Sequence, residues 1–241
     1  MSRTAAVVPA AGRGERLGPG APKALRLLGG VPLLVHAVRA LATARSIDLV
    51  VVAGPPDGLD EVRSLLAEHG LVDAAPGRAG TQVVAGGDTR QDSVARALIA
   101  LPDDVDVVLV HDAARPLAPV SLIDAVAAAV RGGADAVVPG LPVADTIKAV
   151  DEHGVVVATV DREQLRAVQT PQGFRRRLLA EAHAAGDPDA PATDDAGMVE
   201  AIGGTVLVVP GDEEAFKVTR PLDLVLAEAV LARRRAAGVV G

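Results

Sequence analysis

Short apolar runs rich in β-branched residues recur along the chain, and each is bounded by Gly, Pro or Asp. The runs lie at residues 5–8, 49–53, 105–110, 136–138 and 206–209. A continuous apolar run of this length is typical of a strand buried on both faces, as strands are in a parallel sheet. We therefore expect these segments to form a mostly parallel sheet.

The segments between and after these runs have apolar residues mostly at helical spacing. They are residues 33–42, 59–69, 91–101, 120–131, 175–184 and 222–235, and the acidic stretch 192–196 is interpreted as a further helix start. Alternation of strand and helix predicts an open sheet with helices on both faces and with ligands bound beyond the carboxyl ends of the strands. The expected fold is α/β, Rossmann-like and doubly wound, with residues 1–241 forming one domain.

One stretch breaks this alternation. Residues 145–148 and 155–160 are β-prone and flank a polar turn at 151–154, which predicts a β-hairpin. An isolated two-stranded hairpin is marginally stable in water. We expect an arm over about residues 141–162, which either packs on its own domain or exchanges with a partner subunit.

The composition narrows the function classes. Hydrophobic residues make up 49% of the chain but aromatic residues only 1%, so platforms on which bases could stack are nearly absent. The net charge of −7 argues against a general nucleic-acid or acidic-membrane surface. The absence of cysteine excludes disulfides and thiolate chemistry. No apolar run approaches the roughly 20 residues of a membrane helix, and we expect a soluble cytoplasmic protein.

A cationic, glycine-rich loop follows the first predicted strand. Over residues 10–23 it combines glycines at 12, 14 and 18 with Arg13, Arg16 and Lys23. Glycine permits close approach of the backbone, and clustered cations suit a dense anion such as a polyphosphate. The pattern is neither a Walker phosphate loop nor a GxGxxG fingerprint. A phosphate site and a flexible basic loop both remain compatible with it.

A carboxylate stands at the end of the strand predicted at 105–110. Asp112 is placed to hold a divalent cation, because nucleotide-bound Mg²⁺ is typically gripped by one or two carboxylates plus phosphate oxygens. Alternatively, Asp112 caps a turn or pairs with Arg115. The neighbouring His111 is interpreted as structural, because no second histidine or nucleophile accompanies it.

Two further loops carry polar groups. Residues 86–93 offer backbone, carboxylate and hydroxyl groups that suit a base edge or ribose, but taken alone they favour a glycine turn with a helix cap at Thr89 or Asp92. Lys217 is compatible with phosphate binding or with simple solvation. The same loop predicts Thr219 as the cap of the last helix.

Together these segments resemble the 2-C-methyl-D-erythritol 4-phosphate cytidylyltransferase family, within the sugar-nucleotide transferase superfamily. The resemblance spans nearly the whole chain, and its motifs are Ala10-Ala11-Gly12-Arg13-Gly14-Glu15-Arg16, Pro22-Lys23, Gly86-Gly87-Asp88 with Ser93, His111-Asp112-Ala113-Ala114-Arg115-Pro116, Asp145-Thr146-Ile147-Lys148, Thr159-Val160-Asp161-Arg162, Thr170-Pro171-Gln172, Thr193-Asp194-Asp195-Ala196 and Lys217-Val218-Thr219-Arg220-Pro221. It implies the nucleotide-diphospho-sugar transferase type of fold with a protruding arm. It also implies transfer of the cytidylyl group of CTP to the polyol phosphate, with release of pyrophosphate, in isoprenoid precursor biosynthesis.

The resemblance also implies a role for each matching position. Arg16 and Lys23, rather than Arg13, would be catalytic and would stabilise the α-phosphate and the departing pyrophosphate. CTP would be bound by Ala10, Ala11, Gly12, Gly87, Asp88, Ser93 and Lys217. The polyol phosphate would contact Arg115, Thr146, Arg162 and Thr170, and Asp112 would bind Mg²⁺. The arm would reach a neighbouring subunit, so Thr146 and Arg162 would complete the partner's site in a homodimer.

The chain departs from the family pattern at three places. Leu17 replaces a common methionine, residues 24–26 are Ala-Leu-Arg instead of Gln-Tyr-Leu, and residues 215–216 are Ala-Phe instead of an Asn-Ile-like pair. None of these departures removes a charged catalytic candidate.

Three other functions are weighed against this one. A cytidylyltransferase for another polyol phosphate, such as ribitol 5-phosphate, would share the fold and the cations. An NAD-dependent Rossmann dehydrogenase is disfavoured, because the loop lacks GxGxxG and no acidic residue ends the second strand. A catalytically dead nucleotide-binding regulator is disfavoured by the retention of Arg16, Lys23 and Asp112.

Overall fold

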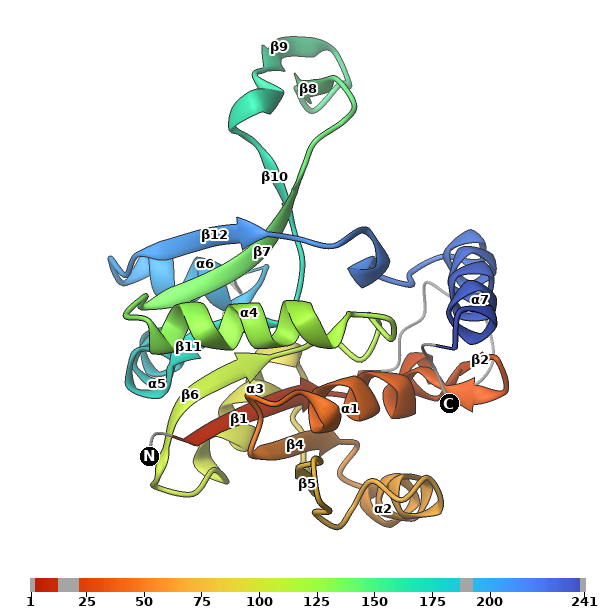
Figure 1. Ribbon diagram of the computed structural model, residues 1–241. Coiled ribbons are helices and arrows are strands. Elements are labelled where there is room, and N and C mark those ends of the chain that lie inside the picture. Colours follow the sequence, from red (N-terminus) through yellow and green to blue (C-terminus); the bar gives the residue numbers. More distant parts are fainter. Residues whose placement is uncertain (1–2, 13–21, 187–192, 239–241) are drawn as a thin grey trace.

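The computed structural model describes residues 3–12, 22–186 and 193–238, and its centre is an eight-stranded sheet (Figure 1). The strands are β1 (Arg3–Pro9), β4 (Leu49–Gly54), β5 (Gly80–Ala85), β6 (Val105–Val110), β7 (Ala136–Pro142), β10 (Arg166–Val168), β11 (Gln172–Arg175) and β12 (Val206–Pro210). The order is β10-β7-β11-β6-β1-β4-β5, and β12 pairs with β7. Pairing is parallel from β6 through β1 and β4 to β5 and between β7 and β12, whereas β10 and β11 run antiparallel to their neighbours. The prediction of a mostly parallel sheet is confirmed.

Helices cover both faces of this sheet because alternate side chains of each strand point to opposite sides. In β1, Ala6 and Val8 belong to the core that includes residues of α1 (Leu33–Thr43), α2 (Leu59–Glu68) and α4 (Val120–Arg131). Ala5 and Val7 belong to the core of the other face, with α3 (Arg90–Ile99), α5 (Arg176–Ala185) and α6 (Asp195–Ala201). The doubly wound α/β arrangement is therefore confirmed.

Three strands of the central sheet, β5, β10 and β11, have no counterpart among the predicted segments, and neither does the separate short pair β2 (Leu27–Leu28) and β3 (Val31–Pro32). In β11 the reason is visible at Gly173, where a Cβ atom would lie 2.7 Å from a methyl group of Val126 on α4. A glycine at this position lets the strand pass close beneath the helix. The same glycine interrupts the apolar pattern by which a strand is recognised in a sequence.

The last helix, α7 (Pro221–Ala236), packs beside β2 (Leu27–Leu28), which pairs with β3 (Val31–Pro32), around buried leucines that include Leu28 and Leu231. Its cap residue is Arg220, so the prediction of Thr219 is wrong by one position. The Asp223 carboxylate accepts hydrogen bonds from the backbone N–H groups of Thr219 and Arg220, at 2.8 Å each. None of the helices within the described residues is long and apolar enough to cross a membrane.

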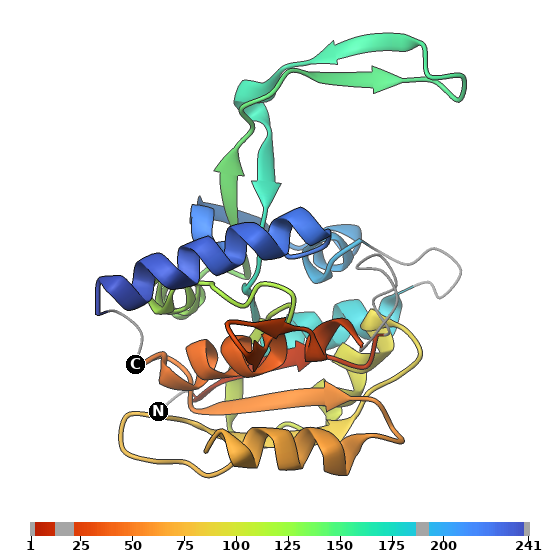
Figure 2. The ribbon, with the colours of Figure 1, turned by 90° about the vertical axis from the view of Figure 1, so that its right-hand side faces the viewer.

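The predicted hairpin forms a separate two-stranded sheet of β8 (Ile147–Val150) and β9 (Val156–Val160). Figure 2 shows it projecting far from the central sheet as an arm. Its valines are strongly exposed, with Val155, Val156 and Val157 at 60%, 54% and 64%. The alternative in which the hairpin packs on its own domain is therefore wrong.

Candidate functional site

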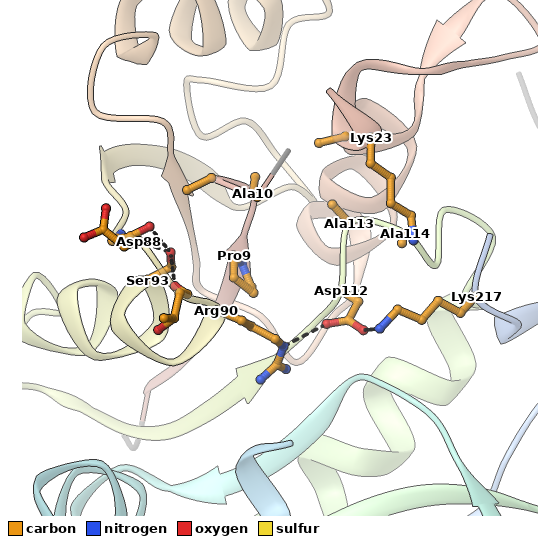
Figure 3. A pocket seen from close by; sticks show the side chains of 15 residues that line it. Pro9, Ala10, Lys23, Asp88, Arg90, Ser93, Asp112, Ala113, Ala114 and Lys217 are labelled. Atoms are coloured by element: carbon orange, nitrogen blue, oxygen red, sulfur yellow. Dashed lines mark hydrogen bonds and ion pairs between the residues drawn. The ribbon is translucent and has the colours of Figure 1, made fainter. Parts of the chain in front are cut away.

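A pocket of about 230 Å³ lies where the parallel strands end. Its walls come from the segments that follow β1, β5 and β6, together with the short helix η2 (Lys23–Leu25) and the loop before α7. Nine predicted site residues meet in it, namely Ala10, Ala11, Gly12, Lys23, Gly87, Asp88, Ser93, Asp112 and Lys217 (Figure 3). The crevice expected at the carboxyl edge of the sheet is therefore present.

The segment after β1 lies directly against the loop after β5. The Ala10 N–H donates to the Ala53 carbonyl at 2.8 Å, which holds the start of this segment to β4. A Cβ atom on Gly86 would lie 2.7 Å from the Cβ of Ala11, so the two segments meet only because this position is glycine. These two closely packed segments form one wall of the pocket.

The loop after β5 is held by its own hydrogen bonds. The Ser93 hydroxyl accepts from the Gly87 N–H at 3.1 Å and donates to the Thr89 carbonyl at 2.9 Å. Thr89 caps α3 through a capping box with Asp92, as the sequence predicted. Asp88 stands exposed at the rim. Through its hydrogen bonds to Gly87 and Thr89, the Ser93 hydroxyl fixes the shape of the loop after β5.

Asp112 lies between two cations, which Figure 3 shows approaching from opposite sides of the pocket. Its Oδ2 is 2.6 Å from the Lys217 ammonium, and its Oδ1 accepts from the Arg90 Nε at 3.2 Å. Burial raises the pKa of this carboxyl, but Arg90 and Lys217 together hold the pKa well below its usual range. The carboxyl is therefore ionised at neutral pH. Its ion-pair partners are Arg90 and Lys217, so the alternative that it pairs with the Arg115 side chain is wrong.

Behind Asp112 lies a fully buried histidine. The Thr170 hydroxyl oxygen accepts a hydrogen bond from the Asp112 N–H at 3.0 Å. The same hydroxyl donates its proton to the His111 Nδ1 at 3.1 Å. The His111 Nε2 then donates to the Arg115 carbonyl at 3.1 Å. Burial lowers the pKa of His111 to about 4, so the ring is neutral. The interpretation of His111 as structural is confirmed.

The pKa of His111 makes stability depend on pH. Because the folded pKa of about 4 is below the unfolded value of 6.5, the unfolded chain binds more protons between these values. The free energy of unfolding should therefore fall as the pH is lowered through this window, by at most about 1.4 kcal/mol per pH unit from this group. Urea unfolding should show a flatter pH dependence for His111→Asn. An unchanged slope in His111→Asn would contradict the assignment.

The remaining predicted site residues lie outside the pocket lining or outside the described residues. Arg115 donates to the carbonyls of Ala215 and Val168 at 2.7 and 3.3 Å. Thr146 and Arg162 are exposed on the arm, where the Arg162 guanidinium donates to a carbonyl at residue 144. Arg16, like Leu17, lies outside the described residues.

Two side chains at this site had no predicted functional role. The Arg90 side chain lines the pocket and donates from Nη1 to Asp195 at 2.7 Å. Asp195 is fully buried and also contacts the His183 Nε2 at 2.9 Å. In the sequence, Arg90 stands two residues after Asp88, and Asp195 is an acidic residue at a helix start. Neither pattern indicates that the two side chains meet.

Comparisons with known proteins agree in one family. The family model described as 2-C-methyl-D-erythritol 4-phosphate cytidylyltransferase matches residues 4–233. Proteins of that name from Streptomyces avermitilis and Streptomyces coelicolor are 62% and 63% identical over 240 residues, covering 97% of this chain and 94% and 87% of theirs. A crystal structure of that name from Thermus thermophilus aligns with a TM-score of 0.74 at 41% identity, covering 97% of this chain and 100% of that one. These matches favour a nucleotidyltransferase over a dehydrogenase.

Proposed function

This chain belongs to the 2-C-methyl-D-erythritol 4-phosphate cytidylyltransferase family, and from that premise we propose how its residues carry out the reaction. The protein is a nucleotidyltransferase that transfers the cytidylyl group of CTP to 2-C-methyl-D-erythritol 4-phosphate and releases pyrophosphate, in isoprenoid precursor biosynthesis. The observation that carries the proposal is the pocket at the sheet edge, where Lys23, Asp112 and Lys217 gather beside two glycine-containing loops.

The acceptor phosphate attacks the α-phosphorus of CTP in line with the leaving pyrophosphate. Such a transfer needs alignment and charge stabilisation more than covalent help from the protein. We propose that Lys23 and Arg16 stabilise the negative charge that develops on the α-phosphate and on the leaving pyrophosphate. The position of Lys23 supports this role. Its side chain lines the pocket and extends toward Ala114, on the side where Lys217 contacts Asp112 (Figure 3).

We assign nucleotide binding to the two segments that form one wall of the pocket, the one after β1 and the one after β5. Ala10, Ala11 and Gly12 would present their amides to the nucleotide, as a glycine-containing turn after a strand often does for phosphates. Gly87 and Asp88 would read cytosine, with an acceptor facing the exocyclic amine, and Ser93 would act by holding Gly87. Lys217 would contact the phosphates.

The divalent cation is assigned to Asp112. An ionised carboxylate is a suitable ligand for Mg²⁺, and nucleotide-bound Mg²⁺ needs only one or two. Within the described residues no group of three or more His, Cys, Asp or Glu side chains could hold a metal ion. The other ligands would therefore be nucleotide phosphates and water. When bound, Mg²⁺ neutralises phosphate charge. Lys217, now on Oδ2, would turn from Asp112 to the phosphates.

The acceptor site is assigned to two subunits. Arg115 and Thr170, next to Asp112, would contact the polyol phosphate from one subunit, whereas Thr146 and Arg162 would come from the arm of the other. A homodimer is supported by exposed apolar side chains on the arm and on α7, where Leu222, Val225 and Leu226 are exposed. We propose that residues 1–241 act as one domain whose arm, at about 141–162, completes the partner's site.

A direct assay tests the acceptor. With CTP and Mg²⁺, pyrophosphate release should be faster with 2-C-methyl-D-erythritol 4-phosphate than with ribitol 5-phosphate at equal concentration. The first acceptor carries the methyl-branched polyol for which the matched family is named. Omitting each acceptor controls for CTP hydrolysis, and faster release with ribitol 5-phosphate would overturn the assignment.

A further inference from the structure

Arg90 spans the floor of the pocket. It is the first residue of α3, directly after the Thr89 cap, and its side chain reaches across to Asp112 (Figure 3). About a third of this side chain is exposed, and it lines the pocket. One arginine therefore connects the loop assigned to cytosine with the carboxylate assigned to the metal.

The far side of the guanidinium is anchored in the protein interior. Its Nη1 donates to Asp195 Oδ2 at 2.7 Å, and the Asp195 side chain is completely inaccessible to solvent. The other oxygen of Asp195 lies 2.9 Å from the His183 Nε2 on α5. Three helices, α3, α5 and α6, thus converge on one ionised pair.

The planar fork of Arg90 suits this position because a guanidinium can hold two carboxylates at once, in fixed directions. With Oδ1 of Asp112 held by Arg90, Oδ2 is the oxygen that meets Lys217. Removing Arg90 would leave Asp195 buried without its cation, which is strongly unfavourable, and would free Asp112 to rotate.

We propose that Arg90 is a positioning residue that orients the Asp112 carboxylate toward the metal–nucleotide complex, and that Asp195 holds Arg90 in place for this task. The inference rests on the proposed role of Asp112 in binding Mg²⁺. A purely structural ion pair between α3 and α6 would explain the same contacts. The two differ in whether the pair affects metal binding.

Calorimetric titration of CTP, with and without Mg²⁺, separates these roles. The readout is the gain in CTP affinity that Mg²⁺ produces, and thermal unfolding is measured alongside. Arg90→Gln and Asp195→Asn should each reduce this gain by about 10-fold or more, the usual scale for residues that orient a metal ligand. The matched control is Arg234→Gln, which breaks a partly buried ion pair with Glu214 outside the pocket and should lower the melting temperature without changing the gain.

Asp112→Asn distinguishes failure of the inference from failure of its premise. A wild-type gain in Asp112→Asn would overturn the metal assignment itself. A reduced gain in Asp112→Asn, with wild-type gains in Arg90→Gln and Asp195→Asn, would overturn the positioning role alone. Should Arg90→Gln unfold the chain, Arg90→Lys keeps the charge and much of the volume. It should still reduce the gain, because one ammonium cannot hold both carboxylates.

Discussion

Replacing Lys23 with alanine is expected to lower kcat by on the order of 10² or more. Lys23 lines the pocket on η2, and its side chain extends toward Ala114 beside the ion pair of Asp112 and Lys217 (Figure 3). Negative charge on the pentacoordinate α-phosphate and the leaving pyrophosphate grows as the reaction proceeds. A fixed cation there stabilises the transition state more than bound CTP, so its loss should appear in kcat.

Steady-state kinetics of pyrophosphate release measures this effect. Arg63→Ala removes an exposed cation of α2 outside the pocket and should leave kcat near the wild-type value. Circular dichroism should confirm that both variants are folded. An increase confined to the KM for CTP would show instead that Lys23 binds the ground state and transition state equally.

The fold could be predicted because its signals are local. The apolar runs at β1, β4 and β6 mark strands without knowledge of their neighbours, and the helical spacing of α4 matches its observed bounds, Val120–Arg131. The edge rule for parallel sheets then places Asp112 and the loop after β1 together. Geometry of this kind follows from periodicity and connectivity.

The partners of the site residues could not be predicted in this way. Nearness in sequence suggested Arg115 as the ion-pair partner of Asp112. In the fold its partners are Lys217, from the loop before α7, and Arg90, from α3. The Asp195 partner of Arg90 comes from another helix altogether. Such pairings depend on how distant segments pack, which residue patterns do not encode. Roles for Arg16, Lys23 and the arm came from family resemblance.

Mixing two inactive variants should restore activity if the arm serves the partner's site. Arg162→Ala and Lys23→Ala are each expected to be nearly inactive as homodimers. In a mixed dimer, the Lys23 of one subunit meets the intact arm of the other, so one of its two sites is native. Equal mixing with free exchange gives half mixed dimers, and therefore about one quarter of the wild-type sites.

This result requires that the arm act between subunits, because an arm that serves its own subunit leaves every site in the mixture defective. The exposed valines of β8 and β9 and the projection of the arm into solvent favour the former (Figure 2). Arg162 also donates to a carbonyl at the base of the arm, so its loss could disturb the hairpin. Thr146→Ala, mixed with Lys23→Ala, repeats the test without breaking that contact. Activity that stays at the sum of the separate variants, despite subunit exchange verified by light scattering and tagged pull-down, would rule out shared sites.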